Sequence, residues 1–235
     1  MTEQVRISKL LAHRGLCSRR EADDYLEKGL VRVDGRVAQL GERVNPDARI
    51  TLEGAAVRRQ RERVTVLLHK PIGYVSGQPE AGYQSAHVLL TPDRQLGAGP
   101  KPPRHLAVAG RLDIDSQGLL VLTDDGRIAR HLIGGHGVEK EYLVRVRRPL
   151  DDAALAALRG PLTLAGRPLR PIGVWRLGPD YLRLVLTEGR KRQIRHMLAD
   201  IGHDVVSLKR VRIGGVRLGG LPVGRWRYLT AGEHF

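Results

Sequence analysis

The segment AGRLDIDSQGLLVLTDDG, from Ala109 to Gly126, carries residue types that are suited to chemistry. Arg111 and Asp113 lie two residues apart in a glycine-flanked bend between two apolar runs, HLAV and LLVLT. Residues two apart along an extended chain face the same side, and a nearby cation keeps a carboxylate ionised in a partly dry cleft. Such a carboxylate suits a nucleophile or a general base. The spacing alone also fits a turn or a structural ion pair.

A second chemical candidate is the basic cluster in EGRKRQIRHM. Arg190, Lys191, Arg192 and Arg195 crowd the start of a helix expected over residues 190–203. Positive charge at that end opposes the helix dipole, so the cluster is favourable if an anion lies there, either a phosphate or a buried carboxylate. Alternatively, these long side chains extend into solvent.

Other kinds of site find no support in the sequence. No GxGxxG follows a strand, no Walker pattern is present, and the nine histidines include no HExxH pair. Asp124 and Asp125 precede an expected helix and are better explained as caps than as metal ligands. A single cysteine, Cys17, excludes an internal disulfide and fits a reducing cytoplasm. We therefore expect neither a metal nor a cofactor.

The charge of the chain favours polyanionic partners. The formal net charge is +15 and the sequence pI is about 10.8, which favours nucleic acid first and an anionic membrane second. No apolar run approaches the roughly 18 residues of a membrane span, and the charged N-terminus lacks the apolar block of a signal peptide. We expect a cytoplasmic monomer with no membrane partner.

Two units must position the chemical candidates. Residues 6–53 predict two helices and a small sheet, with a Ser18–Glu21 capping box and a hairpin at Asp34-Gly35. Residues 54–64 are polar and lack an apolar period, so we expect a linker about which the units swing. Beyond it, many strands with few helices predict an α+β domain around an antiparallel or mixed sheet, with a long loop at 77–104.

Both units resemble known families. RISKLLAHRGLCSRREADDYLEKGLVRVDGRVAQLGERV is similar to an S4 RNA-binding domain over its full length. LLHKPIGYVS, GRLDIDSQGLLVLTDDG, EKEYLVRV and LTEGRKRQIRHMLADIGHDVVSLKRVRIGGVRL resemble, in order, the motifs of the pseudouridine synthases of the RsuA/RluB/RluE/RluF group. The resemblance implies an α+β protein: a small α/β S4 domain with its linker over residues 1–62, then a larger catalytic domain with a mixed or antiparallel sheet over residues 63–235.

The resemblance also implies roles for individual side chains. Asp113 would be the nucleophile that attacks a uridine flipped out of its stack, and Arg195 would pair with Asp113 and keep it ionised. Tyr142 would stack on the uracil or take part in proton transfer, and Arg111 would fill the gap left by the extruded nucleotide. RNA contacts are expected, unless these cations form only a solvated face, at Lys9, Arg14, Arg19, Arg20, Arg32, Arg190, Lys191, Arg192, Lys209 and Arg210.

The sequence says less about the RNA that is modified than about the chemistry of the modification. The segments DSQGL and EKEYLV look most like the RluF branch, which implies that a uridine of large-subunit (23S) ribosomal RNA becomes pseudouridine without cofactor or metal. The same chemistry on 16S rRNA or on a tRNA is an alternative. A non-catalytic S4 RNA-binding or ribosome-assembly factor is another. The loop at 77–104 is longer than in the family, which leaves the target open.

Overall fold

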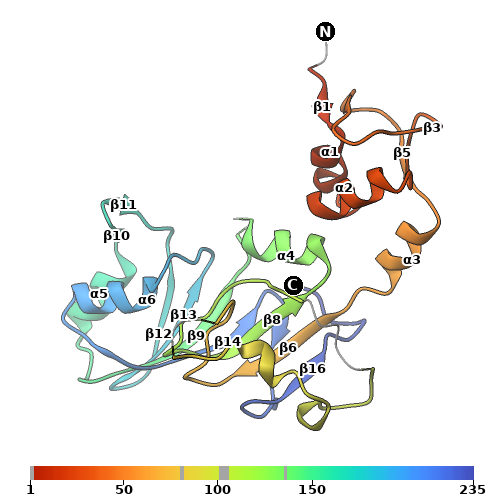
Figure 1. Ribbon diagram of the computed structural model, residues 1–235. Coiled ribbons are helices and arrows are strands. Elements are labelled where there is room, and N and C mark those ends of the chain that lie inside the picture. Colours follow the sequence, from red (N-terminus) through yellow and green to blue (C-terminus); the bar gives the residue numbers. More distant parts are fainter. Residues whose placement is uncertain (1–2, 80–81, 101–105, 135–136) are drawn as a thin grey trace.

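The amino-terminal unit consists of two helices and a small antiparallel sheet (Figure 1). The computed structural model describes residues 3–79, 82–100, 106–134 and 137–235. Helices α1 (Ile7–His13) and α2 (Arg19–Glu27) precede a sheet of order β3-β2-β5, formed by β2 (Val31–Val33), β3 (Arg36–Val37) and β5 (Ile50–Leu52). A further pair joins β1 (Val5–Arg6) to β4 (Arg43–Val44).

Local signals in this unit are confirmed. The Ser18 side chain accepts a hydrogen bond from the Glu21 backbone, and the Glu21 carboxylate accepts one from the Ser18 backbone, which completes the capping box of α2. Asp34 and Gly35 have φ angles of 49° and 87°, as the expected two-residue hairpin between β2 and β3 requires.

The connecting segment differs from the expected linker. Helix α3 (Ala55–Arg61) occupies most of it. Ala56 is fully buried in the core of the amino-terminal unit, and Gln60 donates a hydrogen bond of 3.0 Å to the Tyr25 hydroxyl. The prediction of a flexible linker is wrong because one small apolar residue, Ala56, is enough to dock this polar helix.

The carboxy-terminal unit is built on a nine-stranded sheet whose main path is β12-β13-β9-β14-β8-β6-β16. All strand pairs on this path are antiparallel except β14 with β8. The sheet is therefore mixed, which is one of the two forms that the sequence predicted. Strands β7 and β15 pair off this path, and β10 and β11 form a separate hairpin. The bounds are β6 (Thr65–Lys70), β7 (Ala107–Val108), β8 (Gln117–Thr123), β9 (Lys140–Val146), β10 (Thr163–Leu164), β11 (Arg167–Pro168), β12 (Gly173–Gly178), β13 (Tyr181–Leu186), β14 (Val205–Ile213), β15 (Val216–Arg217) and β16 (Trp226–Tyr228).

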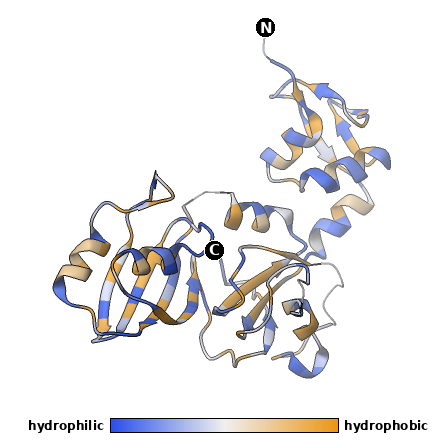
Figure 2. Cartoon of the chain, turned by 60° about the vertical axis from the view of Figure 1, so that its left-hand side comes forward, coloured by the Kyte–Doolittle hydropathy of each residue, from blue (hydrophilic) through white to orange (hydrophobic). Residues whose placement is uncertain are grey.

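Three helices and two short 3₁₀ turns cover this sheet. Helices α5 (Asp152–Arg159) and α6 (Gln193–Asp200) bury Leu158 and Leu198 in the main core, while α4 (Gly126–Ile133) buries Leu132 in a second cluster. The central strands β6 and β8 are buried along nearly their whole length, and Figure 2 shows the central strands of the sheet to be largely hydrophobic. The expected loop at 77–104 contains 3₁₀ turns η1 (Ala86–Leu89) and η2 (Pro92–Arg94), and its residues 80, 81 and 101–104 lie outside the described residues.

Strands β8 and β14 come closest at Gly118. Its φ of 116° is one that residues with a side chain rarely adopt. A Cβ at this position would overlap the backbone of Arg210. Glycine at position 118 therefore permits the parallel pairing of β8 with β14.

The two units are docked against each other. Arg63, between α3 and β6, donates to Glu21 in the amino-terminal unit and, at 3.0 Å, to Asp125 in the carboxy-terminal unit. The side chains of Arg63 and Asp125 are only 4% and 8% exposed, and that of Glu21 is 16% exposed. The expected swinging of the units is therefore opposed by a buried ion-pair cluster. Within the described residues, no helix is long and apolar enough to cross a membrane.

Candidate active site

The segment predicted to be catalytic is a loop, residues 110–116, between β7 and β8. The chain turns at Gly110, where φ is 96°, and again where the Ser116 backbone donates a 3.1 Å hydrogen bond to the carbonyl of Asp113. The expected bend is confirmed, but only the strand after it is buried: β8 is buried along nearly its whole length, whereas in β7 Ala107 is exposed and Val108 is half-buried.

The loop is braced by the segment that follows β6. The Ser76 hydroxyl donates to the carbonyl of Leu112 at 2.6 Å and accepts from its backbone N–H at 2.9 Å. The Gly73 N–H donates to the carbonyl of Ile114 at 2.9 Å. These bonds hold the backbone on both sides of Asp113, as a precisely placed carboxylate requires.

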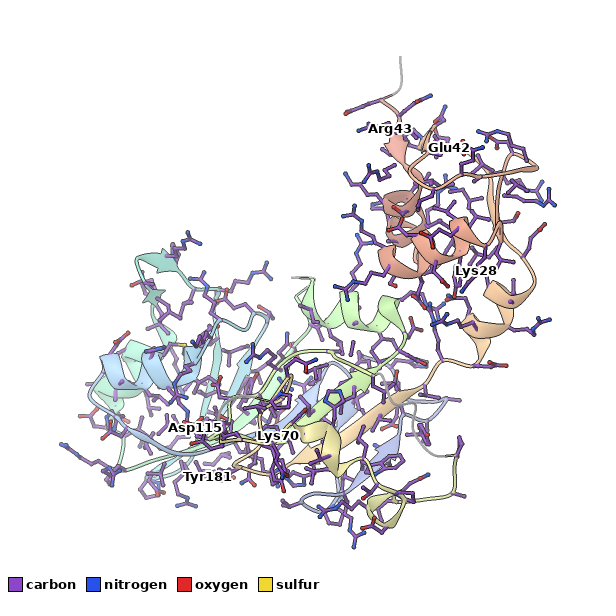
Figure 3. The ribbon with its side chains drawn as sticks, in the orientation of Figure 1. Lys28, Glu42, Arg43, Lys70, Asp115 and Tyr181 are labelled. Atoms are coloured by element: carbon purple, nitrogen blue, oxygen red, sulfur yellow. The ribbon has the colours of Figure 1, made fainter. Side chains whose placement is uncertain are left out.

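The Lys70 side chain holds the end of the loop at Ser116. It is fully buried, and its ammonium donates to the carbonyls of Ser116 and Pro71 at 2.8 and 2.9 Å. Burial lowers the pKa of Lys70 to about 8, although the nearby carboxylates of Asp113 and Asp115 favour its charged form. Figure 3 shows Lys70 and Asp115 near each other in the carboxy-terminal unit.

Arg210, predicted to contact RNA, has a structural position instead. It is 1% exposed, and its guanidinium donates to the carbonyls of Leu119, Arg111 and Gly110 at 2.8, 3.3 and 2.9 Å. Because its donors are used by the backbone of the loop and of β8, the RNA-contact prediction for Arg210 is wrong.

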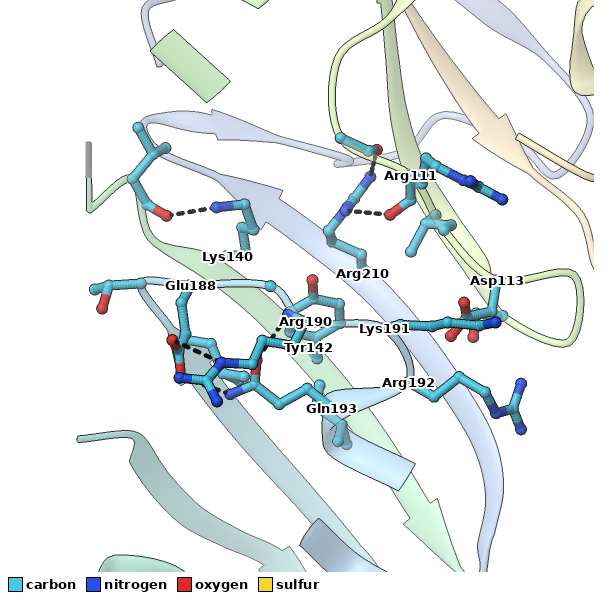
Figure 4. Close-up of a pocket in the computed structure, with 18 of the residues that line it drawn as sticks. Arg111, Asp113, Lys140, Tyr142, Glu188, Arg190, Lys191, Arg192, Gln193 and Arg210 are labelled. Carbon is cyan, nitrogen blue, oxygen red and sulfur yellow. Dashed lines mark hydrogen bonds and ion pairs between the residues drawn. The ribbon is translucent and has the colours of Figure 1, made fainter. Parts of the chain in front are cut away.

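A cavity of about 730 Å³ opens beside the loop. Asp113 from the loop and Tyr142 from β9 line it, together with apolar side chains such as Leu186 and Ile194 (Figure 4). This volume lies in the range of small-ligand pockets. Among the residues that the structure describes, none forms a hydrogen bond or ion pair with the Asp113 carboxylate, so it remains available to a ligand.

The predicted ion pair between Arg195 and Asp113 is absent among the described residues. Arg195 Nη2 lies 3.2 Å from a carboxylate oxygen of Asp115 and donates at 2.8 Å to the Asp115 carbonyl. It also reaches the Ser116 hydroxyl at 3.4 Å, while Nη1 donates to the Val205 carbonyl at 3.2 Å. Arg195 therefore ties α6 to the end of the loop and to β14.

Asp115 binds a second arginine. Arg192 donates to its two carboxylate oxygens at 3.2 and 2.9 Å. Burial acts to raise the pKa of Asp115, but the hydrogen bond from Arg192 and the charges of Arg195 and Arg192 outweigh it, so the pKa is lowered. Sequence reasoning did not assign Asp115 a role, although the alternation of carboxylates in RLDIDS was a signal that could have found it.

The basic cluster before α6 is only partly as expected. Arg190, Lys191 and Arg192 precede the helix, and Arg192 is its N-cap, with an unusual φ of 53°. Arg190 donates to the carbonyls of Leu164, Arg167 and Pro168 at 3.5, 3.3 and 2.6 Å. Arg192 has a carboxylate partner, Asp115, but that side chain is 39% exposed and not buried as expected. Lys191, exposed and without a partner in the described part of the chain, is left to face the cavity.

Two further cavity residues were missed. Lys140 donates to the Val138 carbonyl at 3.0 Å, and burial, with the charge of Arg210, lowers its pKa. Gln193 is 2% exposed and connects the Glu188 carboxylate to the Arg190 backbone at 3.1 and 2.9 Å. The described residues contain no group of three or more His, Cys, Asp or Glu side chains able to hold a metal ion.

The predicted contacts of the amino-terminal unit divide into two kinds. Lys9, Arg19 and Arg20 are exposed and have no partner among the described side chains and carbonyls. Arg14 donates to the carbonyls of Ala48 and Pro46, and Arg32 pairs with Glu53 at 2.6 Å. Those two guanidinium groups hold the unit's own fold, which counts against them as RNA contacts.

Lys209 lies away from the cavity. Its neighbours on β14, Leu208 and Arg210, line the cavity. Successive residues of a strand face opposite sides of the sheet, so Lys209 faces the other side and does not meet a substrate held against Asp113.

Known proteins match both units. Residues 5–50 match the S4 domain, and residues 64–170 match the RNA pseudouridylate synthase family. The dual-specificity RNA pseudouridine synthase RluF of Escherichia coli K12 is 33% identical over 97% of this chain and 77% of the relative. The ribosomal large subunit pseudouridine synthase B of Bacillus subtilis is 33% identical over 97% of this chain and 93% of the relative.

A solved structure shares the architecture. The crystal structure of a pseudouridylate synthase superposes with a TM-score of 0.66 at 26% identity, over 96% of each chain. The expected α+β fold, with an S4 domain before a pseudouridine synthase domain, is confirmed. The chain therefore belongs to the RsuA family of S4-domain RNA pseudouridine synthases.

Proposed function

We propose that this chain converts a uridine of ribosomal RNA, in the large-subunit (23S) rRNA, to pseudouridine, with Asp113 as the nucleophile. The observation that carries the proposal is the Asp113 carboxylate, which lines a cavity of about 730 Å³ together with Tyr142 and has no ion-pair partner among the described residues. The names of the relatives support the target, since the Bacillus subtilis relative is named for the large ribosomal subunit.

The proposed reaction begins with extrusion of the uridine from its stack, at a cost of a few kcal/mol. Asp113 attacks the base or the ribose while the bond between uracil N1 and ribose C1′ breaks. The uracil rotates, a bond forms between its C5 and C1′, and the bond to Asp113 breaks, which returns the carboxylate; C5 loses a proton and N1 gains one. Atoms and electrons balance, because the product is an isomer of the substrate.

Neighbouring side chains have distinct proposed roles. The Tyr142 ring stacks on the uracil or passes a proton, and Arg111 fills the space that the extruded nucleotide leaves. Arg195 acts on the loop through Asp115, which replaces the direct Asp113 pair expected from the sequence. Lys191 is the cation best placed to meet a phosphate at the mouth of the cavity.

The proposed domain boundaries are residues 1–62 for the S4 domain with its connecting helix and 63–235 for the catalytic domain. The separate hydrophobic clusters support this division, because one ends at Ala56 and the others begin beyond it. We also propose that the protein acts in the cytoplasm, since the free thiol of Cys17 fits a reducing compartment.

Tritium release from RNA labelled at uridine C5 tests the function, because the C5 hydrogen is lost in the reaction. Wild type and Asp113→Asn are offered deproteinised large-subunit and small-subunit rRNA separately. We expect release from the large-subunit RNA only, and none by the variant. Release from the small-subunit RNA alone would overturn the target, full activity of Asp113→Asn would overturn the nucleophile, and no release by wild type from either RNA or from immature subunits would favour an RNA-binding factor.

A further inference from the structure

A second concave surface, separate from the catalytic cavity, lies between the two domains. This interdomain groove, of about 620 Å³, is formed by α1, α2 and their neighbours in the S4 domain and by α4 of the catalytic domain. Basic residues from both domains line it: Lys9 and Arg19 on one side, and on the other Arg130 and Arg127, which also pairs with Asp125. None of the described residues that line it is Asp or Glu. The charge of the rim therefore favours an anionic ligand, such as a polyanion, over a neutral or basic one.

The groove has a defined width because the domains are fixed to each other. The buried cluster of Arg63 with Glu21 and Asp125 joins the N-terminal ends of α2 and α4. Arg130 donates across the groove to the carbonyl of Ala12. These contacts keep the facing cations at a constant separation, which a flexible tether between the domains would not do.

Helix α4 lies between the S4 domain and the sheet of the catalytic domain (Figure 1), and it lines both the groove and the catalytic cavity. Its first turns line the groove through Gly126, Arg127 and Arg130, and its last residues, Leu132 and Ile133, line the cavity that contains Asp113. An eight-residue helix is about 12 Å long. The groove and the cavity lie at opposite ends of this helix, so an RNA strand can reach from one to the other within a few nucleotides.

We propose that the interdomain groove binds the phosphate backbone of the same RNA strand whose uridine enters the catalytic cavity, a few nucleotides away. This inference rests on the proposed function for the identity of the strand. The S4 domain then contributes one wall of a site shared with α4, and the spacing between groove and cavity restricts which uridine reaches Asp113. Arg127 and Arg130 were not among the residues that sequence reasoning assigned to RNA.

Salt dependence of RNA binding tests the groove without requiring turnover. The probe is a labelled RNA stem–loop with a uridine-containing loop of seven nucleotides. Arg19→Ala and Arg49→Ala form a matched pair: both residues are exposed arginines of the S4 domain without a partner among the described residues, and only Arg19 lines the groove. We expect Arg19→Ala to reduce the slope of log K against log salt by about 0.7 to 0.9, as for one lost phosphate contact, and Arg49→Ala to leave it unchanged. Equal effects of the two substitutions, or no effect of Arg19→Ala, would overturn the proposal that the groove binds RNA.

Crosslinking then tests the spacing. The natural cysteine, Cys17, is buried, so Lys9→Cys offers a selectively reactive thiol for an azidophenacyl label. Crosslinks within about five nucleotides of the modified uridine are expected, and crosslinks confined to distant helices would overturn the shared strand. The binding measurement is independent of catalysis: it can support the groove in a protein that shows no tritium release, and active protein with unchanged salt slopes would reject the groove alone.

Discussion

Arg195 Nη2 lies 3.2 Å from the carboxylate of Asp115, two residues beyond the carboxylate that it was expected to neutralise. Arg192 binds the other oxygen of the same carboxylate at 2.9 Å. Asp115 thus holds Arg195 of α6 and Arg192, the N-cap of that helix, and the Asp113 carboxylate stays free for a substrate. The side chain of Asp115 is 39% exposed, so solvent screens these pairs and their contribution to stability is about 1 kcal/mol or less. Their importance is in positioning the loop.

Asp115→Asn should lower kcat by about tenfold to a hundredfold, because loss of these pairs lets the loop carrying Asp113 shift by a fraction of an ångström or more. The KM for RNA should change less than twofold, and Asp115→Glu should restore part of kcat. Tritium-release kinetics would measure both constants. Asp204→Asn is the control, since its partner Arg147 is 3.6 Å away and its side chain is 71% exposed. A raised KM with unchanged kcat would contradict a positioning role.

Arg63→Gln should destabilise the protein by about 3 kcal/mol, the lower end of the range for a broken buried pair, because Glu21 and Asp125 lose their shared cation while Asp125 keeps its pair with Arg127. Arg59→Gln, in the same connecting segment, should cost less than about 0.5 kcal/mol, since Arg59 is 61% exposed and 3.6 Å from Asp24. Urea denaturation, monitored by circular dichroism, compares the stabilities of the two variants. Equal midpoints for the two variants would show that the domains are not held by this cluster.

Gly118→Ala should destabilise the protein by about 3 kcal/mol. The φ of 116° is strained for alanine, and the added methyl overlaps the Arg210 backbone where β8 meets β14. Gly178→Ala, also in a strand, meets its nearest atom at 3.6 Å and should change stability by less than about 1 kcal/mol. Thermal unfolding of the two variants distinguishes them; a Gly118→Ala protein as stable as wild type would refute the close approach of these strands.

Lys70 should give stability a dependence on alkaline pH. Burial lowers its pKa from 10.5 to about 8, so between these values the unfolded chain binds a proton that the folded chain has lost. Stability from this group therefore rises with pH between about 8 and 10.5 and is constant below about 8, where both states are protonated. The full gain is about 3 kcal/mol.

The check is the urea midpoint of wild type and Lys70→Met between pH 7 and 10. Lys70→Met lacks the titrating group, so the two curves should diverge above pH 8, with wild type gaining relative to the variant. Any constant loss caused by the missing hydrogen bonds to Pro71 and Ser116 shifts one curve without altering its slope. Parallel curves would mean that Lys70 stays charged in the folded protein.

Several features of the site could be predicted because they depend on a few neighbouring residues. The capping box at Ser18 and Glu21 and the hairpin at Asp34-Gly35 each require only a short stretch of chain, and both formed as expected. The bend that carries Asp113 between two strands was likewise predictable from its glycines and its apolar flanks, although only β8, and not β7, is buried.

The errors all concern long side chains or weakly apolar segments. Arg210 was expected at the surface and is buried among carbonyls of β8 and the loop, and the polar segment at 54–64 became a docked helix. A sequence pattern shows that an arginine is charged and long. It does not show which of several acceptors the folded chain brings within reach.

The sequence by itself determined the family, the order of the two domains, the local turns and the carboxylate at position 113, since these follow from contiguous motifs. The tertiary structure alone decided that Arg195 meets Asp115, 80 positions away, and that Arg63 joins two helix ends from different domains. The physical reason is reach: an arginine side chain extends several ångströms, so its partner is set by how strands and helices pack, and that packing depends on contacts between residues distant in sequence.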